Sequence, residues 1–296
     1  MSALDLAALQ SAFPQIPAEL PTQGQVIVDL DRGSWREASA EWPKGEKTQA
    51  QLYLCGQASA QLVVVCRPLP PNGAPNEGFW SALLGRGAHV LILEDFSKQF
   101  FGKGVELFGP DRAAMIAAVQ RLMGALGTTE LLCCASSGGG PGAIALAAAL
   151  GGRRLALFSA ATILTRDYYD RMFKERFKEK RKVKDEKLDR DRVARHRERM
   201  VEALGSQHQF DGRKALSLCP QKVQVRLHYP ANLFWDRAWA EHLAGLEGVT
   251  LVPHEDLRSH AIAKNEQPDS SLADQELVGW LLQGRLPSSA ALPLAA

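Results

Sequence analysis

The stretch at residues 131–150, LLCCASSGGGPGAIALAAAL, constrains the fold more than any other part of the chain. An apolar run that suits a buried strand passes through two serines and three glycines directly into an alanine-rich helix. A serine on such a sharp turn needs neighbours without bulky side chains, because the two backbone segments close on each other. Ala135 and Gly139 meet this need around Ser137, so the stretch predicts a strand-to-helix turn that presents a serine.

A serine presented in this way is typical of a nucleophile elbow and indicates acyl-transfer chemistry. The amide of Gly138 and the positive end of the following helix are expected to face the developing oxyanion. Ser136 is the alternative nucleophile, since it also fits a small-x-Ser-x-Gly frame with Cys134 as the first small residue. We favour Ser137 because alanine fits the crowded position better than cysteine. The competing interpretation is a glycine-rich turn that binds a phosphate or only reverses the chain.

The composition is ordinary for a soluble globular protein with a core, with 46% hydrophobic and 23% charged residues among 296. The cysteines lie mostly inside apolar runs and show no metal-ligand spacing, so we expect reduced core thiols, no metal and no cofactor. They are Cys55, Cys66, Cys133, Cys134 and Cys219. The N-terminus lacks a basic start with a long apolar core, and no run approaches the roughly 18 apolar residues of a spanning helix. These features predict a cytoplasmic protein without a membrane span.

The apolar runs change in character along the chain. A strand is predicted at 25–30, and the runs at 51–55 and 61–66, separated by GQASA, predict an antiparallel hairpin. Beyond them strands alternate with helices, and continuous apolar runs are typical of parallel strands covered by helices on both faces. The predicted strands lie at 87–93, 129–134, 154–159, 223–229 and 249–252, and the helices over about 110–126, 236–246 and 272–283. The sequence therefore predicts an α/β fold with a mostly parallel sheet.

An insertion over residues 161–215 separates two predicted strands and is too long for a bare connection. Residues 166–199 contain 15 Lys or Arg against 9 Asp or Glu, although the whole chain has a net charge of only +2. We expect a solvated helical cap on a core formed by 1–160 and 216–296, with its apolar stripe packed on that core. The alternative is a basic lid that attracts an anionic substrate or partner. Nucleic-acid binding is disfavoured because acidic residues are interleaved and no base-reading motif accompanies them.

A serine is a poor nucleophile until a base removes its proton, so the turn calls for a histidine from later in the chain. His260 follows the last predicted strand and precedes the final helix, where loops at the carboxyl edge of the sheet converge. His254, which lies closer to that strand, is the competitor.

Several carboxylates are candidates for orienting this base. Asp236 follows the penultimate strand, but its place before RAWAEHLAGL also suits the N-cap of a helix. The sequence leaves both interpretations open. Asp95 and Asp256, which follow other predicted strands, are the alternatives at the same edge.

The loop CRPLPPNGAPNEG is expected to supply the second oxyanion donor, and its prolines have no N–H to offer. Leu69 is therefore the first candidate, with Asn72 and Gly73 as the others. Arg67 lies at the same strand end, where it either recognises a carboxylate or oxyanion or is merely solvated.

The order of strand, ASSGGG turn, charged insertion, late aspartate and late histidine resembles an α/β-hydrolase fold protein over about residues 50–285. More narrowly, ASSGGGPGAIALAAALGGRRLALFSAATIL, DRAWAEHLAGLEGV, SHAIAK and LVGWLLQGRL resemble a bacterial α/β-hydrolase group often associated with glycan or capsular polysaccharide biosynthesis. The resemblance implies Ser137 as nucleophile, Asp236 as acid and His260 as base. Gly138 departs from that group, where a larger residue is usual, so the resemblance does not extend to the substrate.

The sequence thus predicts a serine-dependent hydrolase or acyltransferase acting on an ester or thioester, with a small-molecule or glycan-linked acyl substrate. The alternative is a catalytically inactive α/β-hydrolase scaffold that binds a partner or an anionic glycan through its basic cap. A nucleotide-binding protein is disfavoured because SSGGGPG lacks the phosphate-loop lysine and the dinucleotide glycine spacing.

Overall fold

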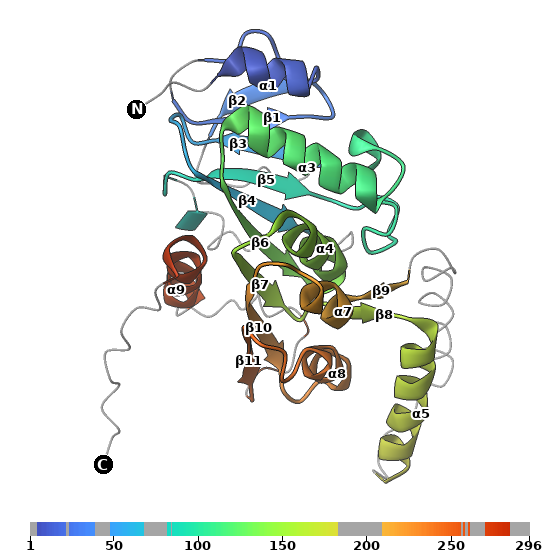
Figure 1. Cartoon of the computed structure of the whole chain (residues 1–296). Coiled ribbons are helices and arrows are strands. Elements are labelled where there is room, and N and C mark those ends of the chain that lie inside the picture. Colours follow the sequence, from blue (N-terminus) through green and yellow to red (C-terminus); the bar gives the residue numbers. More distant parts are fainter. Residues whose placement is uncertain are drawn as a thin grey trace, which may run out of the picture.

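The computed structural model describes residues 5–21, 24–38, 48–67, 82–83, 85–182, 209–255, 257, 260 and 270–284. Within these segments, nine strands form one sheet in the order β11-β10-β7-β6-β4-β5-β3-β1-β2 (Figure 1). The strands are β1 (Val26–Asp29), β2 (Ser34–Glu37), β3 (Ala50–Leu54), β4 (Gln61–Cys66), β5 (His89–Leu93), β6 (Glu130–Ser136), β7 (Arg154–Phe158), β10 (Gln224–Pro230) and β11 (Val249–His254).

The part of the sheet from β5 to β11 is parallel throughout. Val64 of β4, for example, lies between Leu91 of β5 and Cys133 of β6, and all three side chains are fully buried. Helices on both faces keep water from β4, β5, β6 and β7, which is why these strands are continuous apolar runs in the sequence. The predicted α/β fold with a mostly parallel sheet is confirmed.

The predicted hairpin between residues 51–55 and 61–66 is wrong. Strand β5 lies between β3 and β4, antiparallel to β3 and parallel to β4. All five residues of its HVLIL run are buried, so this strand gains more by lying inside the sheet than at an edge. The short connection after β3 passes the start of β5, where the His89 ring accepts a hydrogen bond from the Cys55 amide at 3.4 Å.

Helices cover the two faces of the sheet with separate apolar clusters (Figure 1). One face carries α1 (Leu6–Ala12), η1 (Glu106–Phe108), α3 (Arg112–Leu126), η2 (Ser137–Gly139), α4 (Gly140–Leu150) and α8 (Phe234–His242), and the other carries α9 (Ser270–Gln283). The buried Arg154 holds α9 in place by donating to the carbonyls of Leu281 and Leu282 at 2.5 and 2.9 Å. None of the helices in the described segments is long and apolar enough to cross a membrane.

The cysteines largely follow the sequence prediction. All five are free thiols; four are buried, and Cys219 is half-buried. Burial raises the pKa of Cys66 well above its usual value, which keeps this thiol protonated and unreactive.

The segment between β7 and β10 contains β8 (Ile163–Leu164), α5 (Arg166–Lys182), β9 (Phe210–Asp211) and α7 (Gly212–Ser217). Strands β8 and β9 pair antiparallel and join its two ends, while α5 projects from the rest of the molecule (Figure 1). At the start of α5 the apolar stripe packs on the core, with Tyr168, Tyr169 and Met172 buried. The sequence also predicts Phe173, Phe177, Val183, Leu188, Val193, Met200 and Leu204 as members of this stripe. The last five of these lie outside the described residues, as do the side chains of Phe173 and Phe177. The division into core and cap stays a prediction.

Candidate active site

The serine turn forms where β6 ends at Ser136 and α4 begins at Gly140. Ser137 has a φ of 48°, a left-handed backbone conformation that costs a non-glycine residue roughly 1–2 kcal/mol. A Cβ on Gly139 would lie 2.2 Å from the Cys66 carbonyl oxygen, and one on Gly140 would lie 2.4 Å from that of Ala161. The need for glycine at 139, inferred from the sequence, therefore has a steric basis, and Gly140 adds a second contact that the sequence did not indicate.

The two adjacent serines occupy different backbone conformations. Ser136 is extended, with φ and ψ of −126° and 151°, and pairs opposite Phe158 as the last residue of β6. The Oγ atom of Ser137 lies 2.8 Å from Nε2 of His260. The structure thus brings Ser137 into contact with the histidine favoured from the sequence.

Asp236 completes a hydrogen-bonded chain with these two residues. Its Oδ1 atom lies 2.6 Å from Nδ1 of His260, and the side chains of Asp236 and His260 are 3% and 44% exposed. An ionised carboxylate only accepts hydrogen bonds, so Nδ1 carries the proton and Nε2 presents its lone pair to the Ser137 hydroxyl. In this tautomer the imidazole can accept the proton of Ser137.

The N-cap interpretation of Asp236 is wrong. Helix α8 begins at Phe234 after Leu233 as its N-cap, so Asp236 lies inside the first turn. The helix starts earlier than the predicted 236–246, since its first bond already runs from the Arg237 amide to the Leu233 carbonyl at 2.9 Å. In the first turn a carboxylate is stabilised by the helix dipole, and here it is buried and faces the histidine.

The alternative carboxylates are placed differently. Asp95 is buried and organises its own loop, accepting hydrogen bonds from the Ser97 hydroxyl and from the amides of Gln99 and Phe101 at 2.5, 2.8 and 2.8 Å. Asp256 lies outside the described residues.

The competing base His254 pairs with another histidine. Its Nε2 lies 3.1 Å from Nδ1 of His228, and the two rings stack with centroids 5.4 Å apart. Burial, Arg226 and His254 together lower the pKa of His228 to about 3. His228 is therefore neutral at physiological pH, and its ring serves as a packing surface between Phe158 and His254.

The residues around the expected oxyanion position are only partly described. Gly138 is buried in the turn, while Leu69, Asn72 and Gly73 lie outside the described residues. The Arg67 amide donates to the Leu93 carbonyl at 2.9 Å.

Arg67 is not solvated, in contrast to one of the two interpretations of its strand-end position. Its guanidinium is buried and pairs with the buried carboxylate of Glu94 at 2.6 Å. Burial lowers the pKa of Arg67, and the adjacent carboxylate opposes that shift. Glu94 follows β5 directly, so this buried pair joins the ends of β4 and β5 beside the serine turn.

Sequence reasoning missed Trp239, whose indole meets the His260 ring edge-on with centroids 6.2 Å apart. It lies one helical turn beyond Asp236, and this spacing on the same helix face was the signal that could have found it. It also missed Thr162, whose hydroxyl donates to the Trp239 carbonyl at 2.6 Å. No local pattern marks Thr162, because its partner is 77 residues away.

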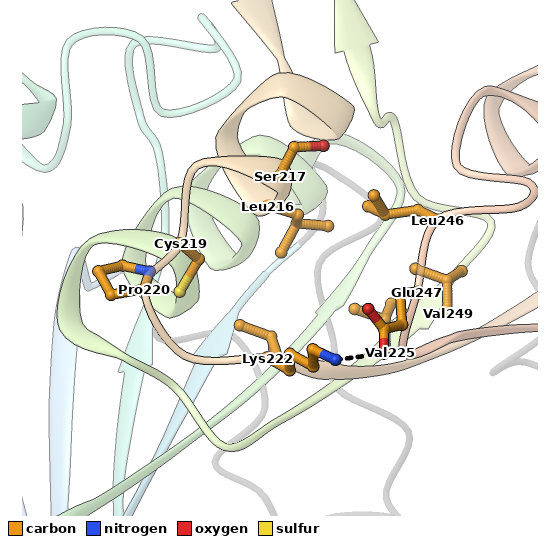
Figure 2. A pocket seen from close by; sticks show the side chains of 10 residues that line it. Leu216, Ser217, Cys219, Pro220, Lys222, Val225, Leu246, Glu247 and Val249 are labelled. Carbon is orange, nitrogen blue, oxygen red and sulfur yellow. Dashed lines mark hydrogen bonds and ion pairs between the residues drawn. The ribbon is translucent and has the colours of Figure 1, made fainter.

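A pocket of about 290 Å³ lies away from these residues, where α7 ends and β10 and β11 begin (Figure 2). Polar and apolar groups line this pocket to a similar extent, and its Lys222 and Glu247 side chains form an ion pair. Parallel strands begin at the edge opposite to the one where Ser137 lies, so this pocket does not adjoin the serine. Among the described residues, no group of three or more His, Cys, Asp or Glu is placed to hold a metal ion.

Several solved structures are similar in fold to this chain. A carboxylesterase structure from Nitrososphaera gargenis has a TM-score of 0.49 at 14% identity, over 80% of this chain and 97% of that one. The proline iminopeptidase-related protein from Thermus thermophilus has a TM-score of 0.45 at 17% identity, over 81% and 96%. An esterase from Exiguobacterium antarcticum has a TM-score of 0.45 at 15% identity, over 77% and 96%. No protein-family model matches the sequence, and no curated protein is significantly similar to it.

Proposed function

We propose that this protein is a serine-dependent hydrolase or acyltransferase that acts on an ester or thioester. The observation that supports it is the chain of two short hydrogen bonds, 2.8 Å from Ser137 to His260 and 2.6 Å from His260 to Asp236. Core packing alone does not explain why Ser137, with its strained backbone, places its hydroxyl against Nε2 of the half-exposed His260. The same arrangement is what a nucleophile, a base and an orienting carboxylate require.

In the proposed reaction, the Ser137 hydroxyl attacks the acyl carbon while Nε2 of His260 takes its proton. Asp236 keeps the proton on Nδ1 and stabilises the imidazolium that forms. The leaving alcohol or thiol then takes the proton from Nε2, and an acyl-serine remains. The amide of Gly138, directly after the serine, is the proposed main-chain donor to the oxyanion.

Hydrolysis and acyl transfer share this acyl-enzyme and differ only in the acceptor that resolves it. Water attacks the acyl-serine in a hydrolase, whereas a hydroxyl of a second substrate attacks in an acyltransferase. A glycan hydroxyl or a glycan-linked acyl group is the substrate class suggested by the sequence resemblance, and it remains part of the proposal. A product analysis with and without an added sugar acceptor separates the two reactions.

The test is hydrolysis of p-nitrophenyl acetate and butyrate by the wild type, Ser137→Ala and Ser136→Ala. We expect turnover in the wild type, its loss by at least about a thousandfold in Ser137→Ala, and its retention in Ser136→Ala. Ser136 is the matched control because it is the adjacent serine in the same strand-to-turn segment. If turnover were lost in Ser136→Ala and retained in Ser137→Ala, Ser136 would be the nucleophile. A folded wild type without activity on any acyl ester or thioester would favour the inactive scaffold.

A further inference from the structure

Helix α8, which carries Asp236, depends on residues from outside it to complete its carboxyl end. The last four carbonyls of a helix have no partner within it, and in α8 these belong to residues 239–242. The Leu243 amide turns back to the carbonyl of Ala240 at 3.0 Å, and that of Ala244 to Glu241 at 3.0 Å. By the general pattern of an α-helix, the carbonyls of Trp239 and His242 need donors from outside the helix.

Side chains from both ends of the segment between β7 and β10 supply those donors. The Thr162 hydroxyl donates to the Trp239 carbonyl at 2.6 Å, and Arg213 donates to the His242 carbonyl at 3.1 Å. The Tyr168 hydroxyl adds a bond to the carbonyl of Ala238 at 2.7 Å. Of these donors, Thr162 is fully buried, so no water can replace its hydroxyl.

The residues next to Thr162 contact the serine turn. We name Ala160–Thr162 the bridging segment; all three residues are fully buried. Its Ala161 amide donates to the carbonyl of Ser137 at 2.9 Å. The Ala161 carbonyl packs so closely on Gly140 that a Cβ there would lie 2.4 Å away. One short segment therefore holds the nucleophile turn on one side and α8 on the other.

The position of α8 determines two contacts of the His260 ring. Asp236 binds Nδ1 of His260 from the first turn of the helix, and Trp239 packs against the same ring from the next turn. A shift of α8 would therefore move the imidazole relative to Ser137.

We propose that Thr162 is a positioning residue for the reaction, acting through α8 to keep His260 within reach of the Ser137 hydroxyl. This inference rests on the proposed function. Threonine suits the position because its methyl group fills the buried space while its hydroxyl supplies the missing donor. Valine has nearly the same shape without the donor, and serine has the donor without the methyl group, so the two substitutions separate packing from hydrogen bonding.

The test compares Thr162→Val and Thr162→Ser by kcat, KM and the rate of labelling with a fluorophosphonate. Small displacements of reacting groups reduce rates by up to about a hundredfold, so we expect Thr162→Val to lower kcat and the labelling rate at least about tenfold at unchanged KM. Thr162→Ser should stay within about threefold of the wild type, because the donor to Trp239 is kept.

Thr128→Val is the matched control. Thr128 is also a buried threonine whose hydroxyl donates to the end of a helix, at 3.3 Å to the Met123 carbonyl of α3, far along the chain from α8. We expect this variant to keep kcat and to lower the melting temperature only slightly, because the Met123 carbonyl also accepts from the Thr128 amide at 2.9 Å. Equal losses of kcat in Thr128→Val and Thr162→Val would overturn the inference, since they would show a general effect of destabilisation.

Two further outcomes would also overturn it: a folded Thr162→Val with wild-type kcat, or a Thr162→Ser that loses as much activity as Thr162→Val. If Thr162→Val does not fold, Tyr168→Phe decides the question, because it removes another donor to α8. A lower kcat at unchanged KM supports the inference, and an unchanged kcat contradicts it. Failure of the proposed function would differ from all of these, because the wild type itself would then not be labelled.

Discussion

The serine turn and helix α8, which carries Asp236, are held in place by different kinds of contact. The turn is held by close backbone contacts: Gly139 and Gly140 lie so near the carbonyls of neighbouring segments that no side chain fits. Helix α8 is instead held by side chains distant in sequence, above all Thr162 and Tyr168. His260 joins the two regions through one hydrogen bond to each.

This difference predicts how the two regions respond to mutation. A close backbone contact has no room to relax, so a change in the turn should act first on folding. A side-chain hydrogen bond can be removed with little change of shape, so a substitution in or around α8 should act first on the turnover rate.

Asp236→Asn tests the role of α8, and we expect it to have the largest effect on turnover among the predictions that follow from this comparison. Turnover should fall at least about a hundredfold and as far as about 10⁴-fold, because the neutral amide favours the wrong tautomer and no longer stabilises the imidazolium. Asparagine retains hydrogen-bonding capacity toward His260, so the melting temperature should fall by only about 2–4 °C. Steady-state kinetics and thermal unfolding of the same preparation measure both quantities.

Asp95→Asn serves as the comparison for that variant, since Asp95 holds its own loop. Near-normal turnover in Asp236→Asn together with a severe loss in Asp95→Asn would move the orienting carboxylate to Asp95. A large fall in melting temperature with normal turnover per folded molecule would make Asp236 a structural residue only.

Gly139→Ala tests the serine side. The added Cβ would lie 2.2 Å from a carbonyl oxygen of β4, so we expect a loss of about 3 kcal/mol or more in the free energy of unfolding. Gly124→Ala is the matched control in the exposed part of α3, where an added Cβ meets nothing within 4 Å. There alanine should stabilise the protein by about 0.5–1 kcal/mol. Equal stability of the two variants in urea would refute the steric account of the turn.

A smaller effect concerns the stability of the fold in acid, which depends on the buried side chain of His89. Burial lowers the pKa of His89 to about 4 in the folded protein, against about 6.5 in an unfolded chain. Below pH 6.5 the unfolded state therefore binds a proton that the folded state rejects, and stability falls by up to roughly 1.4 kcal/mol per pH unit until about pH 4.

His89→Asn removes this titration and keeps an acceptor for the Cys55 amide. Urea unfolding at pH 7, 6 and 5 should give a shallower decline in the variant than in the wild type. Parallel declines would mean that His89 does not contribute to acid sensitivity. If His89→Asn stays folded at low pH and still loses activity, that loss comes from the reacting groups and not from unfolding.

The comparison also explains what the sequence could predict. The serine turn was predictable because the requirements read from the sequence lie in consecutive residues, Ala135 to Gly139, and apolar runs indicated the parallel strands around it. The hairpin between residues 51–55 and 61–66 was predicted wrongly, because nothing local shows that β5 comes between β3 and β4.

For helix α8, the sequence indicated Asp236 as a candidate but could not decide between its two possible roles. Asp236 fitted both an N-cap and a carboxylate partner, and only the start of α8 at Phe234 excludes the cap. The bond from Thr162 to Trp239 has no sequence pattern, since it depends on how two distant segments pack.

The most direct test of the central claim, that Ser137 is the nucleophile of a Ser–His–Asp site, is to map the adduct formed with a fluorophosphonate. We predict one modified peptide containing residues 131–150, with the phosphonyl group on Ser137. Labelling should be lost in Ser137→Ala, strongly slowed in His260→Gln and retained in Ser136→Ala. An adduct on Ser136, or an unlabelled wild type that is folded, would contradict the account.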